Sequence, residues 1–309
     1  MFVVTGEALI DLMAKHNGSY EPAVGGAPYN FARALSLQGV PVGYLNPLSE
    51  DRFGLLLRNG LTEAGVKHLG ATSAKPTSLA LVSANEQGQP SYSFYREAVA
   101  DRELTSVAVI AAINASITGF HTGGLALVPP DHETVLAGLR YARELGVPRT
   151  VDVNLRPQVA TSMGVSSTQY RDAAFAVIGE ADILKVSDED LRHLGLTSEP
   201  RVAARELLTF GARLVVLTMG ASGAWVLSKN HELFQAADRV NVVDTVGAGD
   251  CFFAGFIASL ARAGAIASLL RITPDEGTLN RALIHGTRCA AINISRQGCQ
   301  PPTWNEATL

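Results

Sequence analysis

The segment 244–250, with the sequence DTVGAGD, constrains the fold of this chain more than any other part of it. A valine-rich run at 240–243 precedes it and predicts the end of a strand, and the apolar run 251–260 predicts a buried helix. A strand would then enter a helix through a turn of small residues. The first N–H groups of such a helix lack partners within the helix, and its dipole favours an anion there.

Asp250 is the unusual member of this turn, because a carboxylate there lies beside a predicted anion site. Gly247, Ala248 and Gly249 would let a phosphate approach the backbone closely. If the anion is a phosphoryl group in transfer, Asp250 can accept the proton of the attacking hydroxyl. The alternative is structural, since an aspartate in a first helical turn commonly complements the dipole.

Composition narrows the class of protein. The 309 residues are 47% hydrophobic and 17% charged, which supports a sizeable core, and the net charge of −4 predicts neither nucleic-acid nor membrane binding. No apolar run reaches the roughly 18 residues of a membrane span. Cys251, Cys289 and Cys299 are an odd set without C-x-x-C spacing, and no signal peptide is visible. We therefore expect a cytoplasmic protein.

Alternating strand and helix patterns predict an α/β fold with a mainly parallel sheet and helices on both faces. The expected strands are 2–11, 116–121, 150–153, 182–186 and 213–218, with a hairpin at 224–227 and 232–235. The expected helices are 131–145, 170–179, 187–194, 201–210 and 275–293. The sequence predicts one domain over 1–309, with a small β-lid formed by about 12–25 and 77–98.

The lid prediction rests on the segments 77–83 and 91–96, which flank a polar connector containing glycine and proline. This pattern is typical of a β-hairpin, and a hairpin beside an α/β sheet is a candidate lid. Arg96 at its end could reach a polar ligand or could simply be solvated. Because an uncovered edge strand invites pairing, we also predict a homodimer through the lid.

Several polar residues follow predicted strands or open helices, and ligands bind at the carboxyl ends of parallel strands. Asp11 ends the first predicted strand, and Asn30 follows Gly25 and Gly26 at a helix start. Asn154 and Arg156 follow the strand 150–153, and a glycine-containing turn at 218–223 lies at the same edge. His121 also ends a strand, where a lone histidine is more often structural than catalytic.

Several enzyme classes are disfavoured by missing motifs. The sequence has no P-loop, no G-x-G-x-x-G after the first strand, no G-x-S-x-G elbow, no H-E-x-x-H and no protein-kinase signature.

Two distant segments together resemble the PfkB, or ribokinase-like, family of carbohydrate kinases. Residues 25–30 (GGAPYN), with Gly39 and the segment 51–54 (DRFG), resemble its N-terminal signature. Residues 244–250, with Gly255, resemble its C-terminal D-T-x-G-A-G-D signature. The resemblance covers nearly the whole chain and implies a three-layer α/β/α domain that uses ATP and Mg²⁺.

The resemblance implies a role for each group of residues. The catalytic base is Asp250, and the anion hole is Gly247, Ala248 and Gly249. The sugar contacts are Asp11, Gly25, Gly26, Asn30, Arg96, Asn154 and Arg156. The nucleotide contacts are Lys185, Ser187, Thr218, Gly220, Gly223 and Gly249. The metal ligands are Asp190, through water on Mg²⁺, and Asp244, Val246, Asn293 and Gly298 for a monovalent cation such as K⁺.

The chain departs from the family pattern at two places. The family's N-x-x-E motif is here Ser187-Asp188-Glu189-Asp190, which changes the expected Mg²⁺ shell. Pro302 stands where some relatives offer a hydroxyl to the cation, so that ligand would be a carbonyl or absent.

The substrate is less constrained than the chemistry. The segments 6–12, 93–101 and 152–157 are most similar to bacterial fructokinases, which implies transfer to the O6 hydroxyl of D-fructose. Arg96 and Arg156 could equally hold a carboxylate, which keeps 2-keto-3-deoxygluconate kinase open, with aminoimidazole riboside kinase as a third alternative. The rivals from other classes are a non-catalytic sugar-binding paralogue and, more distantly, a dinucleotide-dependent oxidoreductase.

Overall fold

The computed structural model describes residues 1–15, 17–84, 90–196 and 198–308. Within these ranges a nine-stranded sheet forms the centre, in the order β15-β14-β13-β12-β11-β10-β1-β4-β6, with only β14 and β15 antiparallel to their neighbours. Its strands are β1 (Phe2–Val4), β4 (Val42–Tyr44), β6 (Lys67–His68), β10 (Gly119–Gly123), β11 (Arg149–Asp152), β12 (Ile183–Ser187), β13 (Leu214–Thr218), β14 (Ala224–Ser228) and β15 (Glu232–Gln235).

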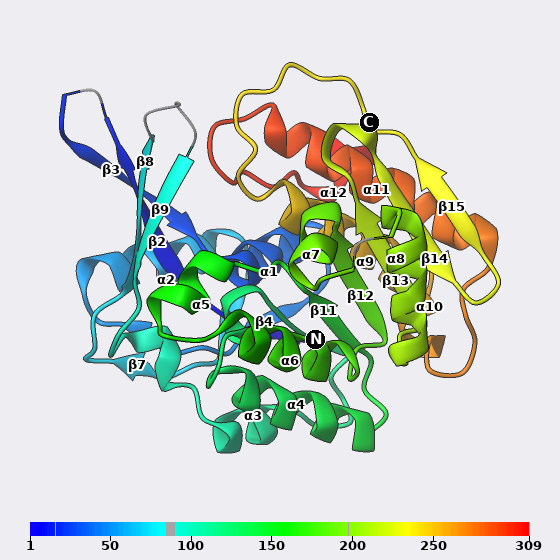
Figure 1. The fold of residues 1–309 in the computed structure, drawn as a ribbon, viewed down its shortest axis with the longest axis horizontal. Coiled ribbons are helices and arrows are strands. Elements are labelled where there is room, and N and C mark those ends of the chain that lie inside the picture. Colours follow the sequence, from blue (N-terminus) through cyan, green and yellow to red (C-terminus); the bar gives the residue numbers. More distant parts are fainter. Residues whose placement is uncertain (16, 85–89, 197, 309) are drawn as a thin grey trace.

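Buried side chains alternate between the two faces of this sheet. On β13, Val215 and Leu217 join one core, whereas Leu214 and Val216 join the other. The first core includes residues of α3, α4, α6 and α8, and the second includes residues of α1, α2, α9 and α11. Figure 1 shows helices on both sides of the sheet. The α/β prediction with three layers is therefore confirmed.

The helices have the following bounds. They are α1 (Ala27–Leu37), α2 (Arg52–Glu63), α3 (Ser106–Ala112), α4 (His132–Glu144), α5 (Pro157–Ser162), α6 (Ser167–Ile178), α7 (Asp188–His193), α8 (Pro200–Glu206), α9 (Ala248–Arg262), α10 (Ala265–Ser268), α11 (Glu276–Ile294) and α12 (Trp304–Thr308). Short 3-10 turns lie at η1 (Ala100–Glu103), η2 (Gly124–Leu127), η3 (Leu207–Phe210) and η4 (Gly220–Ser222). The segment predicted as one helix over 201–210 is thus α8 followed by η3.

A second sheet projects from one end of the body (Figure 1). Its strands are β2 (Leu9–Ala14), β3 (Tyr20–Gly25), β8 (Ser78–Ala84) and β9 (Pro90–Tyr95), in the order β3-β2-β8-β9. β8 and β9 pair antiparallel, which confirms the predicted hairpin. Its connector, 85–89, lies outside the described residues. A small pair, β5 (Leu48–Ser49) and β7 (Thr72–Ser73), completes the β-structure of the described ranges.

The prediction of a single first strand over 2–11 is wrong. β1 ends at Val4, and the chain leaves the central sheet to enter the projecting sheet as β2. The break lies at Gly6, which has a φ of 141°. A Cβ added at Gly6 would lie 2.2 Å from Cγ of Pro28, so only glycine fits this position. Asp11 therefore lies on the projecting sheet and not at the end of a central strand.

The strand predicted before the segment 244–250 is also absent. Val240, Val242 and Val243 lie in an exposed loop. The N–H groups of Val243 and Asp244 donate to the carbonyl of Ile294 at the end of α11, at 2.8 and 3.2 Å, and not to a strand. β10 also begins three residues later than its predicted start at 116. Of the helices in the described part of the chain, none is long and apolar enough to cross a membrane.

Candidate active site

The start of α9 forms the centre of the candidate site. Gly247 is its N-cap in the left-handed conformation, with φ 73°. A Cβ added at Gly247 would lie 2.3 Å from Sγ of Cys299, so only glycine fits this position. The N–H of Ala248 donates to the carbonyl of Thr245 at 3.2 Å, so this donor is not unpaired as the sequence suggested.

Asp250, in the first turn of α9, is buried and accepts a 3.0 Å hydrogen bond from Nδ2 of Asn30 on α1. Burial, and then the charge of Asp152, raise the pKa of Asp250 to about 7, while Lys185 and Asn30 act in the opposite direction. A carboxyl group with that pKa can exchange a proton near neutral pH. Oδ1 of Asn30 is buried and finds no hydrogen-bond partner among the described residues, so it can accept from a ligand hydroxyl.

A buried ion pair lies next to Asp250. Nζ of Lys185 on β12 is 2.9 Å from both carboxylate oxygens of Asp152 on β11. A Cβ at Gly249 would lie 3.0 Å from the same Nζ, which places the ammonium against the glycine turn. The cation is therefore held beside the position where an anion would meet the start of α9.

The projecting sheet brings Asp11 to the same region. Its carboxylate packs against Gly25, because a Cβ there would lie 2.3 Å from Oδ2. Burial raises the pKa of Asp11 to about 6, and the charge of exposed Arg156 partly opposes this effect. Asn154 has a φ of 36°, which is uncommon outside glycine and marks a constrained backbone between β11 and α5.

The predicted nucleotide residues lie at the carboxyl ends of β12 and β13. Ser187 caps α7 and donates its hydroxyl to Asp190 at 2.7 Å, so that hydroxyl already has a structural role. Gly220 has open space around an added Cβ, whereas a Cβ at Gly223 would lie 2.2 Å from the carbonyl of Gln235. Gly220 thus leaves room for a ligand, and Gly223 permits close packing against β15.

Asp190, the predicted Mg²⁺ residue, is buried with both carboxylate oxygens engaged. Oδ1 accepts from the N–H of Leu155 at 2.7 Å, and Oδ2 accepts from the N–H of Ser187 at 2.8 Å. Carboxylate oxygens have further lone pairs, and Mg²⁺ commonly uses one or two carboxylates together with substrate phosphates. A role through water fits this donor set.

The structure also brings together the residues predicted to hold a monovalent cation. The carboxylate of Asp244 accepts from the N–H groups of Val246 and Gly298 at 3.0 and 2.9 Å. Nδ2 of Asn293 donates to the carbonyl of Val246 at 2.8 Å. The loop before α9 is thereby tied to the loop after α11. Carbonyl and carboxylate oxygens are suited to a hard cation.

The site combines a glycine turn, a buried carboxylate and polar residues at the ends of neighbouring strands. This arrangement agrees with the comparison to known families. The model of the pfkB family carbohydrate kinases matches residues 1–306. The chain belongs to the pfkB family of carbohydrate kinases. The kinase is therefore a phosphotransferase that uses a carbohydrate as the acceptor.

Relatives of this kinase include a fructokinase from Rhizobium leguminosarum bv. trifolii, 34% identical over 267 residues that cover 84% of this chain and 79% of the relative. Among solved structures, fructokinase with bound ATP from Xylella fastidiosa has a TM-score of 0.88 at 26% identity, covering 99% of this chain and 96% of that one. Aminoimidazole riboside kinase from Salmonella enterica has a TM-score of 0.83 at 25% identity, covering 99% and 97%.

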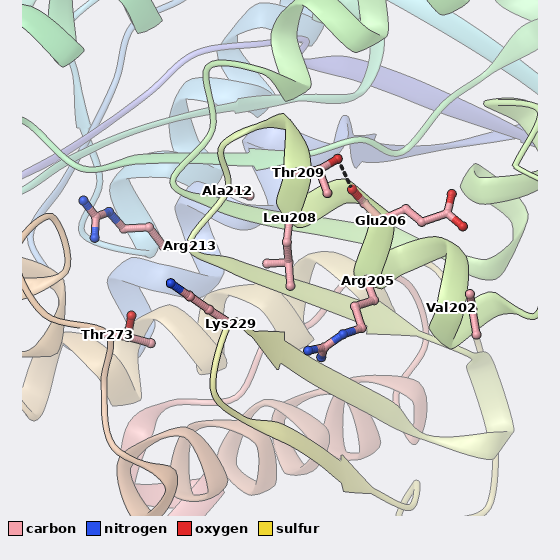
Figure 2. Close-up of a pocket in the computed structure, with 9 residues that line it drawn as sticks. All are labelled: Val202, Arg205, Glu206, Leu208, Thr209, Ala212, Arg213, Lys229 and Thr273. Carbon is pink, nitrogen blue, oxygen red and sulfur yellow. Dashed lines mark hydrogen bonds between the residues drawn. The ribbon is translucent and has the colours of Figure 1, made fainter.

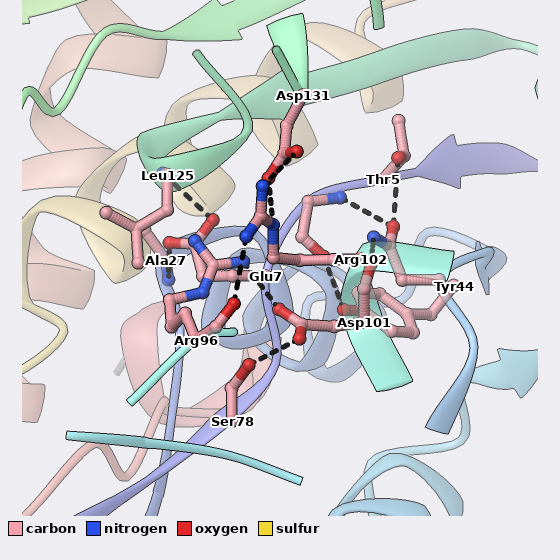
Figure 3. Close-up of polar contacts among 12 residues, drawn as sticks. Thr5, Glu7, Ala27, Tyr44, Ser78, Arg96, Asp101, Arg102, Leu125 and Asp131 are labelled. Carbon is pink, nitrogen blue, oxygen red and sulfur yellow. Dashed lines mark hydrogen bonds and ion pairs between the residues drawn. The ribbon is translucent and has the colours of Figure 1, made fainter. Parts of the chain in front are cut away.

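A buried polar cluster at the base of the projecting sheet contains Arg96 (Figure 3). Nη2 of Arg96 is 2.8 Å from Oδ2 of Asp101, whereas its Nε and Nη1 have no partner among the described residues. Burial raises the pKa of nearby Glu7 to about 7 against the charge of Arg96. Arg96 is thus engaged inside the kinase, and its predicted contact with the sugar stays a prediction.

Sequence reasoning missed Asp152 and Glu7 as site residues. Asp152 ends a buried strand, and a charged residue in such a strand is a signal that could have singled it out. His121, by contrast, has the expected structural role. It stacks on Phe31 with ring centroids 3.7 Å apart, and burial lowers its pKa to about 3.

The described part of the chain contains one cavity beside this site and another away from it. One of about 290 Å³ lies in the polar cluster, between Glu7, Arg96 and Asp131. The other, of about 630 Å³, is shown in Figure 2 and is lined in part by Arg205, Arg213 and Lys229. Because Arg213 precedes β13 and the site residue Thr218 ends it, this second cavity lies at the opposite end of the strand from the phosphoryl-transfer site.

Proposed function

We propose that this kinase is an ATP-dependent fructokinase that transfers the γ-phosphoryl group to O6 of D-fructose. The observation that carries the proposal is the contact between Asp250 and Asn30. It puts a carboxyl group with a pKa of about 7 beside a buried amide oxygen without a partner among the described residues. A sugar hydroxyl has both a base for its proton and an acceptor for a neighbouring hydroxyl at this position.

In the proposed reaction, Asp250 accepts the proton of the attacking hydroxyl. The first N–H groups of α9, at Gly249 and Asp250, and the ammonium of Lys185 stabilise the charge on the transferring phosphoryl group. Removing the hydroxyl proton at neutral pH requires the ionised form of Asp250. Its raised pKa makes it a better base than an ordinary aspartate while leaving much of it ionised.

The nucleotide side of the proposal uses the carboxyl ends of β12 and β13, with half-buried Thr218 and with open space around Gly220. Mg²⁺ would neutralise the phosphates of ATP, with Asp190 acting through water. K⁺ would be held by Asp244 and by the carbonyl groups of Val246, Asn293 and Gly298. Neighbouring structures support these cofactors, since a fructokinase from Vibrio cholerae was solved with fructose, ADP and potassium ion, and a structural neighbour from E. coli was solved with ATP and Mg²⁺.

Fructose is favoured over a sugar acid because the two arginines do not act as a free pair. Arg96 is engaged with buried Asp101, which leaves exposed Arg156 as the cation beside Asp11. Bidentate capture of a carboxylate by two arginines is therefore weakened as an argument for 2-keto-3-deoxygluconate. The relatives named fructokinase in bacteria and plants support the same choice.

The test is a coupled assay at saturating Mg-ATP with fructose, 2-keto-3-deoxygluconate, ribose and aminoimidazole riboside. We expect the highest kcat/KM with fructose, and loss of turnover in Asp250→Ala. Preference for the keto-acid with loss on Arg156→Met, or preference for the riboside, would overturn the fructose assignment. Binding of ATP without turnover of any sugar would favour a non-catalytic sugar-binding protein.

We further propose a homodimer through the lid, the name used here for the projecting sheet β3-β2-β8-β9. Its edge strands β3 and β9 carry Tyr20 and Tyr95, which are 49% and 60% exposed. Exposed edges with aromatic side chains invite pairing with a second copy. Light scattering should give twice the chain mass, and Tyr95→Arg should restore the monomer. A wild-type protein that stays monomeric at micromolar concentration would contradict this proposal.

We also propose that the enzyme acts in the cytoplasm. Its cysteines at 251, 289 and 299 are free and buried, which suits a reducing compartment. Recovery of the protein with a secreted fraction would argue against this location.

A further inference from the structure

All four strands of the lid begin or end at the buried polar cluster shown in Figure 3. β2 begins two residues after Glu7, and β3 ends two residues before Ala27, whose N–H is bound to Glu7. β8 begins at Ser78, whose hydroxyl donates to Asp101, and β9 is followed directly by Arg96. The cluster is therefore the place where the lid joins the body.

Glu7 makes the central connection. Its Oε1 accepts from the N–H of Ala27 at 3.1 Å, and its Oε2 accepts from the N–H of Leu125 in η2 at 3.0 Å. Ala27 is the first residue of α1, so its N–H has no partner within the helix. One carboxylate thus ties the start of α1 to the segment that follows β10.

The surrounding glycines leave the room that this connection needs. A Cβ at Gly26 would lie 2.4 Å from the carbonyl oxygen of Glu7, and a Cβ at Gly124 would lie 2.6 Å from its Oε1. Both glycines have positive φ angles, of 106° and 60°. The backbone is therefore shaped on both sides of the Glu7 side chain, as expected for a residue with a fixed position.

The hydrogen bond between Glu7 and Ala27 lies within one helical turn of the residues that contact the reacting groups. Gly25 and Gly26 immediately precede Ala27, and Asn30, three residues further on, donates to Asp250. A shift of the start of α1 would move all of these residues together. The nucleotide side is built on β12 and β13, whereas the two hydrogen bonds that Glu7 accepts come from Ala27 at the start of α1 and from Leu125 in η2.

We propose that Glu7 is a positioning residue that holds the start of α1 against η2, so that the sugar side of the site is formed before the sugar binds. This inference rests on the proposed fructokinase function. It gives Glu7 no contact with the reacting atoms. It predicts that disturbing Glu7 affects sugar use selectively.

The test compares Glu7→Gln with the wild-type enzyme. The amide keeps the shape but turns an acceptor into a donor, which faces one of the two N–H groups. Because one of the two hydrogen bonds that fix the start of α1 is lost, the KM for fructose should rise at least ~10-fold. The KM for ATP and the affinity for ADP by calorimetry should stay within about twofold, and intact ADP binding shows that the variant folds.

Gly124→Ala provides a second variant, because its Cβ displaces the Glu7 carboxylate without removing it, and it should give the same sugar-selective effect. Glu133→Gln is the matched control. Glu133 lines the same cavity and is exposed. Removing its carboxylate should therefore leave both KM values unchanged.

An unchanged KM for fructose in Glu7→Gln, or equal loss of fructose and ATP affinity, would overturn the proposal. Failure of the wild-type enzyme to phosphorylate fructose would instead overturn the proposed function. The two outcomes are therefore distinguishable.

Discussion

The ionised form of Asp250 should lower the stability of the fold that contains it. Its pKa is about 7 in the folded protein and 3.8 for an ordinary aspartate. Between these two values the unfolded chain has already lost the proton while the folded chain still binds it. Stability therefore falls as the pH rises through this window, and the cost is complete above pH 7 at ~4 kcal/mol, at ~1.36 kcal/mol per pH unit.

Asp250→Asn removes this cost because an amide does not ionise. Its carbonyl oxygen can still accept from Nδ2 of Asn30. The linkage relation gives a cost of about 2 kcal/mol at pH 5 and about 4 kcal/mol at pH 8. The stabilisation by the variant should therefore be about 2–3 kcal/mol larger at pH 8 than at pH 5, while kcat falls by ~10²–10⁴-fold.

Urea unfolding of both proteins without ligands, at pH 5 and pH 8, measures this difference. Glu7 and Asp11, with pKa values of about 7 and 6, titrate in the same range but are present in both proteins, so their contributions cancel. Asp172→Asn, an exposed carboxylate on α6, is the control and should show no such difference. An equal stabilisation at both pH values, or a larger one at pH 5, would refute the reasoning.

Four further predictions concern Asp152, Gly247 and the proposed cation site. Asp152→Asn leaves the ammonium of Lys185 buried without its carboxylate and should lower the free energy of unfolding by about 3–5 kcal/mol, which urea unfolding measures. The same change removes a charge that raises the pKa of Asp250, so the acid limb of the kcat–pH profile should move to lower pH; a move to higher pH would contradict this. Gly247→Ala places Cβ 2.3 Å from Cys299 at a φ of 73° and should lower kcat at least ~10-fold, with wild-type turnover as the refuting result. Replacing K⁺ by choline in the assay should lower kcat, and equal rates in both salts would exclude a functional cation site.

Local patterns carried most of the fold prediction. The helix after the segment 244–250 and the hairpin of β8 and β9 follow from periodicity and turn residues that lie close together in the chain. The first strand was wrong because an apolar run does not show which sheet it joins. The φ of Gly6 and its contact with Pro28 send β2 into the lid, and that contact is made only in the folded protein.

In the candidate site, too, residues within sequence motifs could be predicted, whereas contacts between distant segments could not. Asp250 and Asn30 lie in motifs, so their roles could be predicted, although their mutual hydrogen bond could not. Lys185 was expected to bind nucleotide, but its partner Asp152 lies 33 positions away on the adjacent strand. Glu7 was missed because both of its partners are main-chain N–H groups, and no side-chain pattern in the sequence marks such partners.

The contact between Asn30 and Asp250 joins residues 220 positions apart. During synthesis from the N-terminus, the sugar side of the site is therefore made long before the base that would serve it. Contacts of such sequence separation form late, because a long loop must close before they stabilise anything. A chain in which this contact has not yet formed has no base positioned beside Asn30, so kinase activity should return only when the contact forms.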